Sequence, residues 1–158
     1  MNNLALALPI PAFPAMPSLT EETLDKVRQV EAEISELPQM QIDTLHVIHG
    51  GMYSRTVMVP ANHVIVGVLI KVPTQVIVAG TARVLVGDKF QSISGFNVLP
   101  GQAGRKAIFI AISDIYITMI FKTDAQTVDE AEAEFTDETD ILASRRDESH
   151  NIFVKTED

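Results

Sequence analysis

The 158-residue chain contains neither cysteine nor tryptophan. The absence of cysteine excludes disulfide bonds and thiolate chemistry, and it suits an intracellular origin. The absence of tryptophan disfavours a stacking platform for carbohydrates or nucleotides. No apolar run reaches the roughly 18 residues that a membrane-spanning helix needs, and residues 1–17 lack the basic start of a signal peptide. We therefore expect no membrane partner.

Basic residues are scarce, and the two signs of charge are unevenly placed. The net charge is −9. Residues 1–40 contain two basic and six acidic side chains, residues 41–122 seven and three, and residues 123–158 three and twelve. Nucleic-acid binding is disfavoured, because the phosphate backbone requires concentrated positive charge. The simplest interpretation is a solvated acidic surface. The alternative is that the acidic flanks pack on basic surface of the central region, in the same or a neighbouring chain.

Two segments precede the central region. Residues 1–17 are apolar but contain four prolines, so they form neither a helix nor a central strand. We expect an extended arm that docks on a neighbouring subunit, folds over its own core or remains disordered. Residues 18–38 carry an apolar stripe opposite charged residues, which predicts an amphipathic helix. Ser18 is the expected N-cap, with Glu21 completing a capping box.

The central region, residues 42–122, has the pattern of β structure. Runs rich in Val and Ile alternate with turn signals, which predicts a small sandwich or barrel. The expected strands are 44–48, 53–59, 63–70, 75–79, 81–86, 90–98, 107–113 and 115–121.

Residues 123–158 form an acidic tail with one or two short helices, the first capped by Thr127 and Glu130. The run NIFV at 151–154 is interpreted as a short strand or a docking point. We expect the tail to be exposed, or ordered only by a partner.

Reactive groups are sparse in this chain. His46, His49 and His63 lie in the β region, but no acidic residue is spaced to complete a metal triad with them. A nucleophile elbow, a P-loop and a dinucleotide-binding glycine motif are all missing. We therefore expect no enzymatic activity, no metal and no cofactor. The run PGQAGRK at 100–106 indicates a tight turn with exposed Arg105 and Lys106. The alternative is an anion site built from backbone N–H groups.

A family resemblance rests on glycines and turns between about residues 44 and 135. The runs HVIHGGMYSRTVMVPANHVIVGVLIKVPTQVIVAGTARVLVGD and ISGFNVLPGQAGRKAIFIAISDIYITMIF resemble the small cupin-like proteins of tailed bacteriophages and prophages. The matching features are Gly51, Tyr53 and Arg55, the VPA turn, Gly67, Gly80, the turn from Pro100 to Gly104, and Asp114. The resemblance implies a mainly β fold, a cupin-like double-stranded β-helix (jelly-roll) barrel, flanked by the N-terminal helix and the acidic C-terminal helices.

The same resemblance implies that a metal centre has been lost. The first metal motif of cupins would lie between Gly67 and Gly80, where Ile70, Val72 and Thr74 occupy the ligand positions. In the second motif, the turn is followed by Arg105 and Lys106, whose charge would repel a divalent metal.

Three functional hypotheses follow, in order of preference. The first is a non-enzymatic phage structural or assembly protein. It would be located in the virion, or in the host cytoplasm during assembly, and its partners would be copies of itself or other virion proteins. Its subunit contacts are assigned to Leu8, Ile10, Phe13, Met16, Phe135, Ile152 and Phe153. The alternative is a cupin-like protein that binds a small anionic ligand, with contacts assigned to Tyr53, Arg55, Lys71, Arg105 and Lys106. The third is a metal-dependent enzyme that uses His46, His49 and His63.

Overall fold

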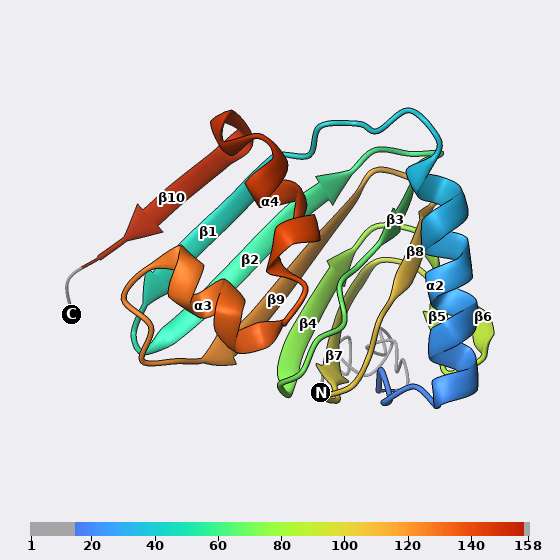
Figure 1. The fold of residues 1–158 in the computed structure, drawn as a ribbon, viewed down its shortest axis with the longest axis horizontal. Coiled ribbons are helices and arrows are strands. Elements are labelled where there is room, and N and C mark those ends of the chain that lie inside the picture. The colour runs from blue at the N-terminus through green and yellow to red at the C-terminus, as the bar shows by residue number, and fades with distance from the viewer. Residues whose placement is uncertain (1–14, 157–158) are drawn as a thin grey trace, which may run out of the picture.

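The computed structural model of the chain describes residues 15–156 (Figure 1). The predicted docking residues Leu8, Ile10 and Phe13 lie outside this range. The strands are β1 (Thr44–His49), β2 (Met52–Val59), β3 (Val64–Val66), β4 (Thr74–Ala79), β5 (Ala82–Val86), β6 (Lys89–Ile93), β7 (Phe96–Gly101), β8 (Ile108–Ala111), β9 (Ile115–Lys122) and β10 (Asn151–Lys155). The helical elements are α2 (Glu21–Ser35), α3 (Val128–Phe135), η1 (Thr139–Ile141), α4 (Ala143–Arg146) and η2 (Glu148–His150).

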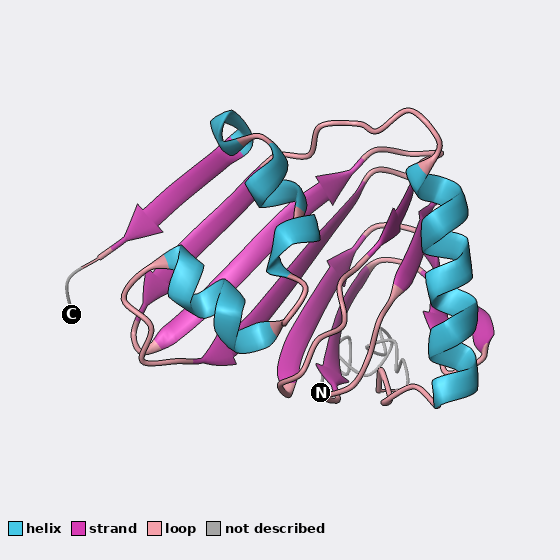
Figure 2. Ribbon diagram, viewed as in Figure 1, coloured by secondary structure: helices cyan, strands magenta, loops and turns pink. Residues whose placement is uncertain are grey.

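The strands form two sheets that face each other (Figure 2). The larger sheet has the order β10-β1-β2-β9-β4-β7, and the smaller sheet has the order β3-β8-β5-β6. Strands β2 to β9 therefore form four nested antiparallel pairs, β2 with β9, β3 with β8, β4 with β7, and β5 with β6. This nesting defines a jelly roll, so the predicted mainly β, cupin-like fold is confirmed. The two sheets remain separate ladders and do not close into a barrel.

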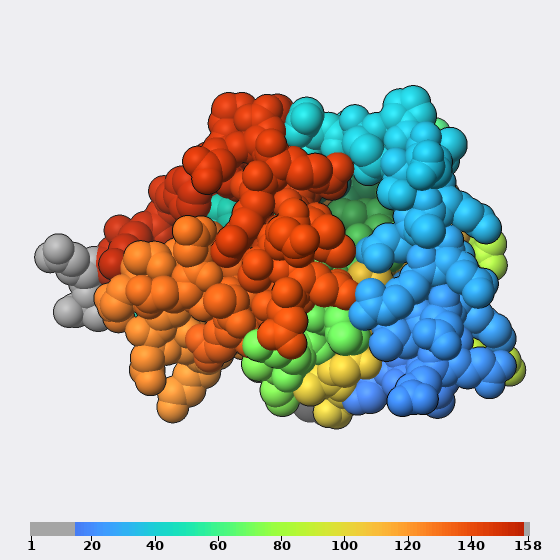
Figure 3. All heavy atoms as spheres, in the orientation of Figure 1, coloured from blue at the N-terminus to red at the C-terminus, as the bar shows by residue number. Residues whose placement is uncertain are grey.

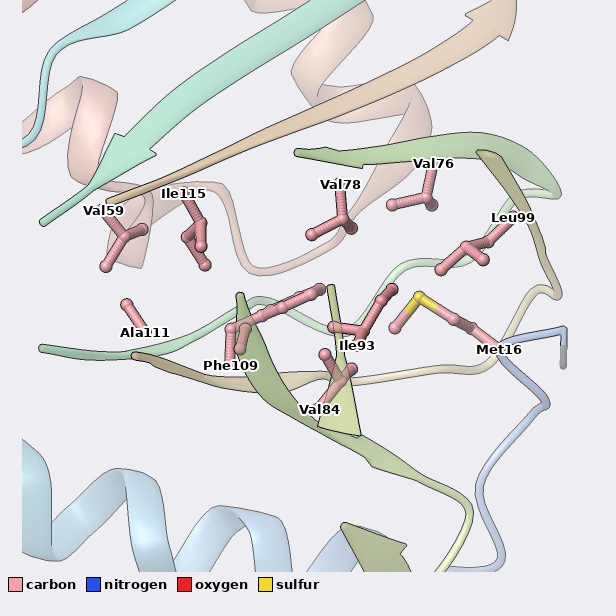
Figure 4. Packing of buried hydrophobic residues seen from close by; sticks show 11 residues of the cluster. Met16, Val59, Val76, Val78, Val84, Ile93, Leu99, Phe109, Ala111 and Ile115 are labelled. Carbon is pink, nitrogen blue, oxygen red and sulfur yellow. The ribbon is translucent and has the colours of Figure 1, made fainter. Parts of the chain in front are cut away.

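The core fills the space between the two sheets. Alternate side chains of each strand point inward, as the pleat of a β-strand requires. Val76, Val78 and Leu99 of the larger sheet face Val84 and Phe109 of the smaller one (Figure 4). Each such side chain contributes roughly 1.5–3 kcal/mol when it is fully buried.

Helix α2 covers the outer face of the smaller sheet (Figure 1). Its N-cap is Thr20 and not Ser18 as predicted, because the Thr20 hydroxyl accepts a hydrogen bond from the Thr23 N–H at 3.2 Å. The Ser18 hydroxyl instead donates to the Ala103 carbonyl. Val27 on the apolar stripe packs against β5 and β8.

Two expected strands differ from the observed ones. The segment 90–98 is divided into β6 and β7 by a turn at Ser94 and Gly95. The segment 63–70 is a strand only in β3, because the following backbone turns toward the C-terminal tail. There the Leu69 N–H donates to the Glu138 carboxylate at 2.9 Å, and the Lys71 N–H donates to the Phe135 carbonyl at 2.8 Å.

The acidic tail packs on the larger sheet of its own chain, which corrects the expectation of an exposed or partner-ordered tail. Helix α3 has the predicted cap, since the Thr127 hydroxyl accepts from the Glu130 N–H at 3.2 Å. Residues 151–155 form β10, which pairs in parallel with β1, so the predicted short strand is confirmed. No helix within residues 15–156 is long and apolar enough to cross a membrane.

Two residues predicted to contact another subunit lie instead in the core of this chain. The Met16 N–H donates to the Pro100 carbonyl, and the Gln102 N–H donates to the Met16 carbonyl, both at 2.9 Å. Met16 thereby extends the edge of β7 and buries its side chain between the sheets (Figure 4). Phe135 is buried against Tyr53, with 6.2 Å between ring centroids. Neither side chain is available to a second subunit.

Candidate functional site

A cavity of about 180 Å³ lies between the sheets, under the C-terminal tail. Its mouth corresponds to the hollow in the surface between the tail, drawn in red, and α2, drawn in blue (Figure 3). Most of its lining is apolar and comes from β2, β3, β4, β8, β9, the segments beside these strands and the tail. It includes Val57, Ile65, Val68, Ile70, Val76, Ala107, Phe109, Ile117, Met119, Ile141 and Leu142.

The ionisable side chains that line the cavity are three arginines, Arg55, Arg105 and Arg146. Among the described residues, the lining contains no histidine and no carboxylate. Divalent metals in proteins are bound by imidazole, thiolate or carboxylate groups, so this donor set does not fit the metal that cupin motifs usually hold. Within the described part of the chain, no three His, Asp or Glu side chains are placed together to hold a metal ion.

Arg105 is the distinctive residue of the cavity, because its cation is buried without an anion. The residue is only 4% exposed, and its guanidinium donates to the Gln102 carbonyl at 2.9 Å and to the Thr74 hydroxyl at 2.5 Å. Among residues 15–156 no carboxylate forms an ion pair with it. Burial lowers the pKa of Arg105 from its ordinary value to about 10, so the side chain is still a cation at neutral pH.

The backbone is shaped to admit this guanidinium. Arg105 lies directly against Gly101, where an added Cβ atom would come within 2.6 Å of the guanidinium carbon. The Ile70 N–H donates to the Arg105 carbonyl at 2.8 Å, which fixes the main chain of Arg105 beside the cavity. A side chain at position 101 would displace the arginine head, so Gly101 is required for this arrangement.

Arg55 also lines the cavity, but its charge is balanced. Its guanidinium contacts the buried Glu132 carboxylate at 3.0 Å and donates to the Ser144 hydroxyl at 3.1 Å. Arg145 contacts the other Glu132 oxygen at 2.9 Å. This network attaches α3 and α4 to β2 and forms one wall of the cavity.

The remaining predicted ligand contacts lie away from the cavity. Tyr53 is buried beneath α3, and burial raises its pKa to about 12. Lys71 is at the surface in an ion pair with Asp137 at 2.6 Å. Lys106 is buried and contacts Glu31 at 2.7 Å and Glu138 at 3.2 Å. The prediction of an exposed turn at Arg105 and Lys106 is therefore wrong for both residues.

The ion pairs decide between the two interpretations of the charge asymmetry. The acidic flanks pair with cations of the central region within the same chain: Glu31 and Glu138 with Lys106, Glu132 with Arg55, and Asp137 with Lys71. Of the buried cations of the central region, Arg105 alone lacks such a partner in the described residues.

The three β-region histidines are not brought together. His46 is buried, its Nδ1 lies 2.7 Å from the Tyr53 hydroxyl, and its Nε2 lies 3.0 Å from the Asn151 amide oxygen. Burial, the largest effect, lowers the pKa of His46. His63 contacts the carbonyl of Ala61 in a turn. The grouping of His46, His49 and His63 as metal ligands is therefore wrong.

Residues of the tail that cover the cavity were missed as site residues. Ile141, Leu142, Ala143 and Arg146 lie on the cavity although they are far from the β region in sequence. The available signal was the adjacent apolar pair Ile141 and Leu142 in an otherwise acidic segment.

No protein-family model and no curated protein matches the sequence. Solved structures of similar shape include the cupin domain of an XRE-family transcriptional regulator from Enterobacter cloacae, with a TM-score of 0.45 and 5% identity over 54% of this chain and 100% of that one. A cupin superfamily protein from Desulfitobacterium hafniense has a TM-score of 0.43 and 13% identity, over 59% and 87% of the two chains. Ectoine synthase from P. lautus has a TM-score of 0.46 and 12% identity, over 63% and 76%. These similarities concern the fold alone.

Proposed function

We propose that the chain binds a small organic anion in the cavity, with the charged group of the ligand on Arg105. The observation that supports the proposal is the buried, unpaired guanidinium beside an otherwise apolar cavity. Burying a cation without an anion is costly, and proteins normally pair such charges. A carboxylate in the cavity would supply the missing negative charge, and the planar guanidinium is shaped to bind it with two parallel hydrogen bonds.

The size and chemistry of the cavity define the ligand class. A volume of about 180 Å³ is below the roughly 300–1,000 Å³ of sites for drug-sized ligands, so a nucleotide does not fit inside. A dry cavity of about 150 Å³ is known to hold benzene. The proposed ligand is therefore a monocarboxylate with an apolar body of about one six-membered ring.

The proposed role is binding and not catalysis. A catalytic site needs a nucleophile, or an acid or base that changes protonation near neutral pH. The cavity lining instead consists of apolar side chains and arginines. This lining supports a protein that holds its ligand without transforming it.

Isothermal titration with benzoate tests the proposal, with benzyl alcohol as the uncharged probe of the same size. The full chain should bind one benzoate and bind benzyl alcohol at least tenfold more weakly. Arg105→Met should weaken benzoate binding about tenfold or more, because a hydrogen bond to a charged group contributes about 1.5–3 kcal/mol. The matched control is Arg83→Met, which removes an exposed arginine on β5. Equal binding of the two probes, or unchanged benzoate binding by Arg105→Met, would contradict the proposal.

A second candidate function is assembly, the role preferred from the sequence. The observation that favours it is the edge strand β10, where Ile152 and Phe153 are exposed and no described strand pairs on the outer side. We propose self-association as the general form of this role, in a virion or the host cytoplasm. The fold neighbours and the described residues do not indicate a phage origin. Recovery of the protein from purified particles would test the virion assignment.

A further inference from the structure

The outer face of the larger sheet is an extended apolar surface. One row of paired residues crosses its six strands: Val98, Ile77, Thr118, Thr56, Leu45 and Ile152. These side chains point away from the core, because their strand neighbours such as Val76 and Val78 point inward.

This face is uncovered in the described part of the chain. Helix α2 packs on the smaller sheet, and the tail helices lie on the inner side of the larger sheet (Figure 2). In the row above, Val98 and Ile152 are each 55% exposed, and in the adjacent row Phe96 is 63% and Tyr116 55% exposed. An exposed contiguous apolar patch of this kind marks an interaction site more often than single exposed residues do.

The charge distribution identifies the kind of partner. The chain carries 21 acidic residues and a net charge of −9, but no outward-facing position of the six described strands is acidic. Two copies would repel each other over most of their surfaces. The outer face is where this repulsion is smallest, and it offers apolar side chains for contact.

The area of the face also fits a second copy. Five strand spacings of about 4.8 Å and six residues of about 3.3 Å give a face of about 24 Å by about 20 Å, roughly 480 Å². Two such faces bury roughly 960 Å² before side-chain corrugation is counted, which is close to the roughly 1,000 Å² that a specific interface needs.

We infer that two copies of this chain pack the outer faces of their larger sheets against each other about a two-fold axis. Sheets pack face to face about 10 Å apart, so rows of the two copies interdigitate as in a β-sandwich. Under two-fold symmetry each residue of the row contributes to the interface twice. The interface is independent of the anion site, which lies on the opposite side of the sheet.

Sedimentation equilibrium of the full chain over a concentration series tests this inference. The wild-type chain should behave as a dimer, and Val98→Glu should raise the dimer dissociation constant at least tenfold by placing a carboxylate in each apolar face. Thr118→Glu, at the centre of the row, should have a larger effect. Far-UV circular dichroism verifies that both variants are folded. The control is Leu37→Glu, which changes a 60% exposed apolar residue just beyond α2 and should leave the dimer intact.

Three outcomes would overturn the inference. The first is a monomeric wild-type chain at all concentrations. The second is a dimer that both glutamate variants leave unchanged, since its interface would lie elsewhere. The third is a monomer that dimerises only after Leu8→Ser and Ile10→Ser are introduced together, since the arm would then be the element that covers the face.

Discussion

Replacing Arg105 with methionine should leave the stability of the ligand-free protein nearly unchanged. Burial lowers the pKa of Arg105 from its ordinary value to about 10. At neutral pH this difference corresponds to a cost of about 3 kcal/mol for holding the cation inside the fold. The variant loses two hydrogen bonds from the charged guanidinium, to Gln102 and Thr74, which together contribute about 3 kcal/mol at the lower end of the range for charged groups. The two contributions cancel, so the expected net change in stability is close to zero.

Urea unfolding without ligand, followed by circular dichroism, measures this change. The free energy of unfolding of Arg105→Met should lie close to that of the wild type near pH 7. The wild type should become the more stable of the two as the pH rises through about 10, because its arginine then loses its proton in the folded state before it does in the unfolded state. Arg83→Met, the exposed control, should change stability by less than about 1 kcal/mol. A loss of more than about 2 kcal/mol for Arg105→Met would refute the reasoning and identify Arg105 as a structural anchor of the turn.

Three further predictions concern the fold around the site. Gly80→Ala should destabilise by about 2 kcal/mol or more in urea unfolding, because φ is +123° and an added Cβ would lie 2.6 Å from the Asp114 carbonyl oxygen. Gly67→Ala, where the nearest atom is 3.8 Å away, should be tolerated, and equal losses for both glycines would contradict this account. Phe135→Ala should cost about 3–5 kcal/mol because the ring is fully buried, whereas a change below about 1 kcal/mol would show that the tail is not part of the folded unit. The free energy of unfolding should fall as the pH drops below about 6.5, because the pKa of His46 is lowered in the fold and the unfolded chain therefore takes up a proton at a higher pH than the folded chain. His46→Gln should flatten this pH dependence. An unchanged slope of unfolding free energy against pH would exclude His46 as its source.

The jelly-roll fold was predictable because its signals are local. Alternating Val and Ile residues and the intervening turns specify the strands of the central region, and the resemblance specifies their order. The predicted strand boundaries were wrong where another interaction of the backbone competed with strand pairing. Residues 67–70 have strong β propensity, yet their backbone bonds to Glu138 and Arg105 instead of extending β3. The break at Ser94 and Gly95 had only one glycine as its signal.

The site was predictable only in part, because burial of a turn depends on distant segments. Arg55 and Arg105, two of the predicted ligand contacts, line the cavity, but Arg105 was expected at the surface. What encloses Arg105 comes from other parts of the chain, including Ile70 and Thr74. The charge asymmetry of the sequence, in contrast, allowed the ion pairs between the flanks and the central region as the alternative to the simpler interpretation of a solvated surface. It could not show that Arg105 would be omitted from them.

A crystal structure of the full chain grown with benzoate tests the central claim most directly. The account predicts one benzoate between the two sheets, with its carboxylate oxygens about 2.7–2.9 Å from the guanidinium nitrogens of Arg105 and its ring against the apolar lining. A benzoate bound only outside the cavity, or one inside whose carboxylate points away from Arg105, would contradict the claim.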